Sequence, residues 1–207
     1  MHPNPVFRKT ETHKNIAFAQ QRSFGILTVN HDDGPLVSHI PFSLSDDGLF
    51  VEAHLVRSNP ILRLLDQPIK AVIAVSGADA YISPDWYDVD NQVPTWNYVA
   101  VHLRGALEKR DHEELPGVLD RLSALMEDRL HPKKPWVTSK MDVDIYEKMR
   151  RQIVPISMNI SDIEGTWKLN QNKTPQARAG AIEGLNSSDI GLEIATLAQY
   201  MKDIPDE

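Results

Sequence analysis

The chain has 207 residues, of which 41% are hydrophobic and 25% are charged, and its formal net charge is −7. The absence of cysteine excludes disulfides, cysteine-ligated zinc, iron–sulfur clusters and a thiol nucleophile, and it fits a cytoplasmic location. No apolar run approaches the ~20 residues of a membrane span, and the first residues do not resemble a signal peptide. The acidic balance argues against direct nucleic-acid binding, and the basic clusters at 133–134 and 148–151 are interpreted as solvated surface.

The first half of the chain is rich in β-forming segments. A short helix is expected at 12–22, and after it apolar and β-branched residues recur in short runs. Residues 31–34 and 46–48 contain the Asp and Gly residues that are typical of turns between such runs. The expected strands cover residues 26–29, 36–44, 49–54, 69–75 and 98–109.

Helices gather in the second half. Residues 111–130 carry an apolar stripe at helical spacing, with Asp111 as the expected N-cap. Antiparallel strands followed by helices predict an α+β domain built on a barrel or sandwich, and the lack of Gly-x-Gly-x-x-Gly argues against a Rossmann site. The remaining elements are expected as helices at 143–151, 175–185 and 189–202 and as a strand at 154–161.

The segment that begins at His54 is the strongest candidate for a binding site. A strand is expected to end near His54 and a short helix to begin at Pro60, with Asn59 as its N-cap. Free amides at a helix start attract an anion, to which Arg57 would add a positive fork and Ser58 a hydroxyl. The alternative interpretation is an ordinary capped helix beside a surface arginine.

Two histidines are expected to share one face of neighbouring strands. A hairpin tip at residues 46–47 pairs His39 with His54. A tip at 47–48 pairs His39 with Val56, and either register leaves both imidazoles on one side. Hydrogen bonding to a ligand is the expected role. No metal site is predicted, because no third ligand follows at metal-binding spacing.

Five large aromatic residues lie between positions 81 and 98. Their flat apolar faces and polar edges suit stacking on a ring system, and a core cluster or a dimer interface is the alternative. Further on, residues 165–172 contain a lysine, a glutamine and two asparagines. The amides would read donor and acceptor positions of a flavin or similar heterocycle, and Lys168 would neutralise a phosphate or a reduced flavin. A plain loop or capping role is the alternative for this segment.

Taken in order, five segments resemble the PaiB family of FMN-binding transcriptional regulators. Each block alone is weakly specific, whereas five in the same order are strongly specific, and the resemblance spans roughly residues 18–186. Ser58 stands where the family more often has alanine, which adds a hydroxyl. The five segments are SHIPF (38–42), HLVRSNP (54–60), AYISPDWY (80–87), VPTWNY (93–98) and WKLNQN (167–172).

The resemblance implies a split β-barrel related to the pyridoxamine-phosphate-oxidase-like and flavin-reductase-like barrels, with FMN as cofactor. It implies a homodimer in which both subunits line each site, and one domain over 1–207 with helical additions at 111–151 and 175–203. The residues implied near the phosphate and ribityl chain are His39, His54, Arg57, Ser58 and Asn59. Those implied near the ring or in the facing subunit are Tyr81, Ser83, Trp86, Thr95, Trp96 and Asn97, with Lys168 and Gln171 completing the pocket.

Several functions stay open at this level. The family label of transcriptional regulator describes genetic effects and not a mechanism, and the sequence contains no helix-turn-helix to supply one. The main alternative is an FMN-dependent oxidoreductase of the flavin-reductase type, because a bound flavin makes hydride chemistry available. A haem-binding split barrel is a further alternative, because the chain has eight histidines. No catalytic residue is predicted.

Overall fold

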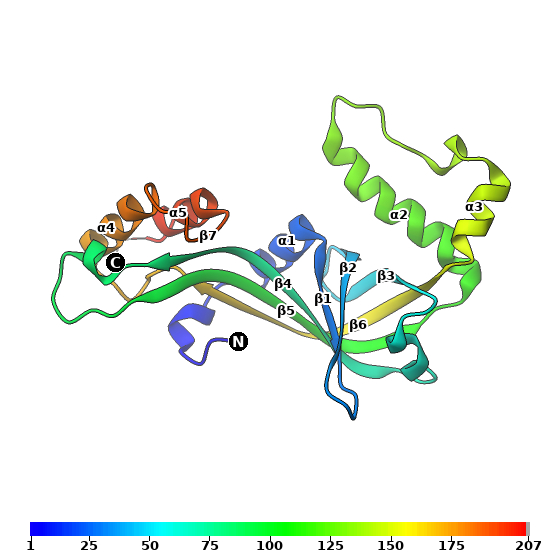
Figure 1. The fold of residues 1–207 in the computed structure, drawn as a ribbon, viewed down its shortest axis with the longest axis horizontal. Helices are drawn as coiled ribbons and strands as arrows, with labels where there is room; N and C mark the ends of the chain where they lie inside the picture. Colours follow the sequence, from blue (N-terminus) through cyan, green and yellow to red (C-terminus); the bar gives the residue numbers. More distant parts are fainter. Residues whose placement is uncertain (206–207) are drawn as a thin grey trace. The chain divides into compact units, whose positions relative to one another are not determined.

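The computed structural model describes residues 1–205, and these form an α+β fold (Figure 1). Seven strands of the described part form one sheet in the order β1-β2-β3-β6-β5-β4-β7, and a further pairing of β1 with β4 closes six of them into a ring. The strand pattern predicted an α+β domain built on a barrel or a sandwich, and the barrel that the family resemblance implies is confirmed. The strands are β1 (Phe24–Val29), β2 (Leu36–Leu44), β3 (Phe50–Val56), β4 (Ile69–Ile82), β5 (Thr95–Lys109), β6 (Ile153–Lys168) and β7 (Gly191–Leu192).

Each predicted helix is present, and three of the five have nearly the predicted bounds. Asp142 starts α3 by accepting hydrogen bonds from the amides of Asp144 and Ile145, and the Thr174 hydroxyl caps α4. The α-helices are α1 (Thr12–Arg22), α2 (Leu115–Glu127), α3 (Val143–Arg150), α4 (Pro175–Leu185) and α5 (Ile194–Lys202). Short 3-10 helices include η2 (Pro60–Leu64) and η3 (Pro84–Tyr87), and others flank α2.

The chain forms two compact units, and each is described by itself. The barrel unit comprises Ile16–Val75 and Leu103–Ile163, and the terminal unit comprises Met1–Asn15, Ser76–His102 and the chain from Glu164 onward. Strands β4, β5 and β6 contribute residues to both units. The single-domain organisation over 1–207 stays a prediction.

In the barrel unit, strand alternation separates an apolar interior from an outer face. Along β2, Ile40 and Phe42 are buried, whereas His39 and Pro41 are exposed. Strand β2 pairs with β3 so that Phe42 faces Ala53, which is the register of the 47–48 hairpin tip. Helix α2 lies against β2 and β3 (Figure 1). It buries three apolar side chains, those of Leu115, Val118 and Leu122.

In the terminal unit, α4 lies against η3 and α5 (Figure 1). Fully buried side chains at Ile82, Tyr87 and Leu185 form part of its core. The edge of the sheet is covered by the two-residue strand β7, in which Leu192 pairs with Asp79. Covering an edge in this way blocks further strand pairing there.

Several predicted boundaries are wrong. Strand β4 continues to Ile82 and does not end at 75. Helix α2 begins at Leu115 and not at 111, because Asp111 caps the 3-10 helix His112–Glu114 that precedes it. Strand β6 extends to Lys168 and does not end near 161, so the first part of the predicted amide-rich segment lies within a strand. The last helix begins at Ile194 and not at 189, because residues before it form β7 and Glu193 adopts a left-handed backbone (φ 53°). A left-handed residue cannot continue an α-helix, so the helix starts after it.

Candidate functional site

The candidate phosphate residues of the barrel unit lie at a turn between β3 and η2. The amide of Asn59 donates to the carbonyl of Val56 at 2.8 Å, so Arg57 and Ser58 form the corner of this turn. Both side chains at the corner are exposed. The corner is therefore open to an anion.

Asn59 is an N-cap, as predicted, and its side chain is fully committed. Its Oδ1 accepts from the amide of Ile61 at 3.0 Å, and its Nδ2 donates to the Ser38 hydroxyl at 2.7 Å. The next amide, of Leu62, donates to the Asn59 carbonyl at 3.1 Å. The prediction of free amides at this helix start is wrong, because η2 is a short 3-10 helix whose first amides are bonded within its own cap. Any attraction for an anion here comes from the turn.

Arg57 is held in place by the two residues that follow α3. Its amide donates to the Gln152 carbonyl at 2.7 Å, and its Nε donates to the Arg151 carbonyl at 2.7 Å. These bonds fix the side chain and leave the terminal guanidinium nitrogens without a partner within residues 1–205. A planar fork with free terminal nitrogens suits a phosphate oxygen pair.

His39 and His54 share the outer face of the barrel, as predicted, and only one of them is covered. His39 is exposed, with its ring 6.4 Å from that of Phe24. The Nδ1 of His54 is buried and has no hydrogen-bond partner in the described part of the chain. Burial lowers the pKa of His54 below its usual value, so the ring is neutral near pH 7. A buried polar atom without a partner is a candidate ligand contact.

The terminal unit contains the candidate ring-binding residues. Tyr81 of β4 and Trp96 of β5 form an edge-to-face pair with ring centroids 6.5 Å apart. Trp96 keeps 46% of its surface exposed, which is high for tryptophan. This exposed aromatic pair is the best candidate in the terminal unit for stacking on a planar ligand.

Lys168 fixes the start of β5 to the end of β6. Its Nζ donates to the Thr95 hydroxyl, through a short hydrogen bond, and to the Trp96 carbonyl at 2.7 Å. Burial, and then the charge of Lys173, lower the pKa of Lys168 from its usual value. Two of its three donor positions are thus used to position the backbone beside Trp96.

Gln171 and Asn97 are also engaged within the terminal unit. The Gln171 side chain accepts from the amide of Leu169 at 2.8 Å and donates to the Trp167 carbonyl through a short hydrogen bond. Asn97 is fully buried, its Nδ2 contacts the Met201 sulfur at 3.5 Å, and its Oδ1 has no hydrogen-bond partner among the described residues. Strand alternation places it on the face opposite Trp96. Both side chains stabilise local structure in this chain, and their predicted cofactor contacts stay predictions.

Trp86 packs tightly on α4. A Cβ atom at Gly184 would lie 2.2 Å from the Trp86 ring, and one at Gly180 would lie 2.2 Å from the Trp86 carbonyl oxygen. The Trp86 indole therefore occupies the space that a side chain at Gly184 would fill, and the Trp86 carbonyl occupies the space at Gly180. Ser83, the residue before η3, has no capping hydrogen bond and is half-buried.

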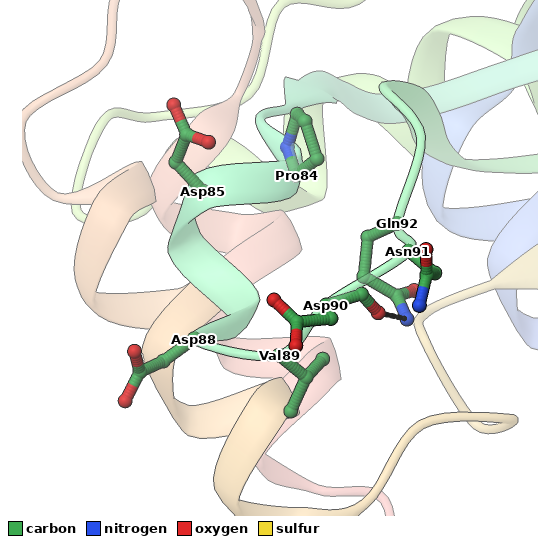
Figure 2. A pocket seen from close by; sticks show the side chains of 7 residues that line it. All are labelled: Pro84, Asp85, Asp88, Val89, Asp90, Asn91 and Gln92. Atoms are coloured by element: carbon green, nitrogen blue, oxygen red, sulfur yellow. Dashed lines mark hydrogen bonds between the residues drawn. The ribbon is translucent and has the colours of Figure 1, made fainter.

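The loop that follows η3 lines an acidic pocket of about 490 Å³ (Figure 2). The carboxylates of Asp85 and Asp88 point away from one another, and the Gln92 side chain donates to the Asp90 carbonyl at 3.1 Å. Within residues 1–205 no group of three His, Asp or Glu side chains is placed to hold a metal ion. The negative charge makes this pocket unsuited to a phosphate.

Asn170, one of the two asparagines of the predicted amide-rich segment, is buried, which its sequence position did not indicate. Asn170 adopts a left-handed backbone (φ 63°) and accepts from the Tyr87 hydroxyl at 3.3 Å, while its Nδ2 has no partner among the described residues. The signal for its backbone was present, because asparagine tolerates a positive φ. Its burial depends on the packing of α4 and η3, which the local sequence does not show.

Comparison with known proteins identifies the family. Residues 1–162, more than half of the chain, match the family model described as "Putative FMN-binding domain". The chain belongs to this family. It is 28% identical over 200 residues to "Protease synthase and sporulation protein PAI 2" of Bacillus subtilis, which covers 95% of this chain and 94% of that protein. The predicted PaiB-type family and the FMN cofactor are thereby confirmed.

Solved structures support the fold. The FAD and haem binding protein of Mycobacterium smegmatis has a TM-score of 0.56 at 15% identity, covering 78% of this chain and 73% of that chain. The flavocytochrome Anf3 of Azotobacter vinelandii has a TM-score of 0.54 at 14% identity, covering 81% and 72%. At this identity the likeness shows the split-barrel fold alone. Among the described residues no helix has the length and apolar character that crossing a membrane requires.

Proposed function

We propose that this FMN-binding split-barrel protein holds the cofactor's phosphate at the β3–η2 turn. The observation that carries this proposal is the exposed Arg57 guanidinium, oriented through its Nε and without an ion pair in residues 1–205. Ser58 adds a hydroxyl at the same corner, and His54 adds a buried Nδ1 that lacks a partner. These groups match the oxygens of a phosphate monoester in charge and hydrogen-bonding capacity.

Residues of the terminal unit are proposed to bind the flavin ring. Tyr81 and Trp96 supply the aromatic surface, and Lys168 fixes the backbone of Trp96 by a hydrogen bond to its carbonyl. When bound, FMN supplies a ring that exchanges electrons. The chain's own residues bind it, orient it and shield it from water.

Exposed apolar side chains on the outer face of the barrel unit lead us to propose a homodimer. Phe24, Val37 and Val56 are 54%, 55% and 56% exposed, and they lie on the outer face that carries His39 and His54. An apolar face next to candidate cofactor residues supports a second copy as its cover, with both subunits lining each site. Phe24→Glu should give monomers in sedimentation equilibrium and weaken FMN binding together. A variant that stays dimeric would place the interface elsewhere.

We infer a regulatory role in the cytoplasm for the flavoprotein. The regulatory role is supported by the resemblance to the PaiB family, and the Bacillus subtilis relative is named for protease synthesis and sporulation. The cysteine-free sequence supports the cytoplasmic location. The net charge of −7 disfavours direct contact with DNA. Purified protein should carry flavin absorbance, and the bound flavin should not be turned over by NADH or NADPH. Steady oxidation of either nucleotide with a defined acceptor would instead establish an oxidoreductase.

The phosphate site is tested by Arg57→Ala. The variant should lose about 1.5–3 kcal/mol of FMN binding, because a hydrogen-bonded charged donor is removed. Riboflavin, which lacks the phosphate, should bind both proteins alike in a fluorescence titration. Arg63→Ala, which removes an exposed arginine from η2, is the matched control. An unchanged FMN dissociation constant in Arg57→Ala would show that the phosphate binds elsewhere.

A further inference from the structure

The two residues that follow α3, Arg151 and Gln152, contact the Arg57–Ser58 turn. Arg57 is bonded through its amide to the Gln152 carbonyl and through its Nε to the Arg151 carbonyl, each at 2.7 Å. Arg57 and Arg151 are 94 residues apart in the sequence. The fold therefore brings the basic cluster that ends α3 to the candidate phosphate site.

In the described part of the chain, no ion pair balances the positive charge at this point. Arg57 and Arg151 are both exposed, and neither has an ion-pair partner within residues 1–205. Arg150, by contrast, pairs with Glu147 at 3.3 Å and lies over the Tyr146 ring. In a chain with a net charge of −7, two neighbouring unpaired arginines are a local departure from the overall charge.

Two opposing effects act on an anion here. The carboxyl end of a helix carries partial negative charge, which repels an anion and attracts a guanidinium. The hydrogen bond from Arg57 to the Arg151 carbonyl uses this attraction to orient the side chain. A phosphate monoester with about two negative charges is then attracted by two guanidiniums, which outweigh the partial charge of one short helix.

We propose that Arg151 is a second phosphate-binding residue and that it sets the preference of this protein for FMN over unphosphorylated flavin. The proposal rests on the phosphate site proposed above. Arg57 engages the phosphate from the turn, and Arg151 does so from the end of α3. Both side chains have the planar donor geometry that suits phosphate oxygens.

The test measures dissociation constants of FMN and riboflavin for the full chain by flavin fluorescence. Arg151→Ala should raise the FMN dissociation constant about 5- to 10-fold and leave that of riboflavin within about twofold, since an exposed charged contact is removed. Arg151→Lys keeps the charge without the planar fork and should recover part of the loss. Lys148→Ala removes one exposed charge a turn earlier on the same helix and is the matched control.

The outcomes separate this inference from the proposed site. If Arg151→Ala keeps the wild-type preference for FMN over riboflavin while Arg57→Ala loses it, the role of Arg151 is overturned and the proposed site at Arg57 stands. Equal losses in Arg151→Ala and Lys148→Ala that disappear when salt is raised show a general field and also overturn it. A wild-type protein that does not distinguish FMN from riboflavin overturns both proposals. Circular dichroism of each variant confirms that it is folded.

Discussion

The barrel unit and the terminal unit use their candidate residues differently. At the β3–η2 turn of the barrel unit, Arg57 and Ser58 are exposed, and the buried Nδ1 of His54 lacks a partner among residues 1–205. In the terminal unit, Lys168 and Gln171 are bonded to nearby backbone groups, and two polar atoms without a partner in the described part of the chain, Asn97 Oδ1 and Asn170 Nδ2, belong to buried residues. Unpaired polar groups beside an exposed turn indicate ligand contacts, whereas groups bonded to the surrounding backbone indicate a scaffold.

This difference gives each unit its own experimental signature. Substitutions at the turn of the barrel unit should discriminate between FMN and riboflavin, because they remove phosphate contacts. Substitutions in the terminal unit should change stability, or should affect both flavins equally. The predictions below test that division, beginning with the largest expected effect.

Gly184→Ala should destabilise the terminal unit by about 2–3 kcal/mol or more. The added Cβ would lie 2.2 Å from the Trp86 ring, a distance that packing cannot accept without a shift. The control is Gly117→Ala in α2, where the nearest atom is the flexible end of Arg121 at 3.1 Å and alanine is the better helix former. Thermal unfolding of both variants measures the contrast. Equal stability in the two would show that Trp86 is not fixed by α4.

Lys168→Met should lower stability by about 1–2 kcal/mol, because the Thr95 hydroxyl and the Trp96 carbonyl lose their Nζ donor. We expect FMN and riboflavin to lose affinity together, because the start of β5, which carries Trp96, is loosened. Denaturant unfolding and the two flavin titrations measure these effects. A loss confined to FMN would instead assign Lys168 to the phosphate.

Trp96→Leu should weaken both flavins by about 0.5–1.5 kcal/mol, which is typical of an aromatic contact. Stability should change little, because 46% of the side chain is exposed in the free chain. Val93→Ala, at a side chain that is 73% exposed in the loop just before β5, is the control. If Trp96→Leu binds both flavins as tightly as the wild type, Trp96 is not part of the ring-binding site.

The smallest effect concerns the pH dependence of stability through His54. Its pKa in the folded chain is lowered by burial, so the unfolded chain binds more protons at acidic pH. The stabilisation is complete above the unfolded pKa near 6.5 and is lost as pH falls through the folded pKa. His54→Gln should show a weaker loss below pH 6.5 in denaturant unfolding. His13→Gln, at an exposed helix position, should behave like wild type.

The sequence alone determined what depends on neighbours along the chain. Alternation of apolar residues placed β2 at 36–44, and the Asn59–Pro60 pair marked the start of η2. The period of two also put His39 and His54 on one face without knowledge of the exact register. The ordered motifs identified the FMN-binding family, because they preserve residue types whatever their contacts.

Only the tertiary structure decided which polar groups stay open for a ligand. Gln171 has the same polar groups as any flavin-binding amide, but the fold bonds both of them to the backbone of its own segment, at Leu169 and Trp167. It also brought Arg151 beside Arg57 across 94 residues. The physical reason is that hydrogen bonds and charge balance depend on groups that are close in space, and the local sequence does not show which distant groups the fold brings together.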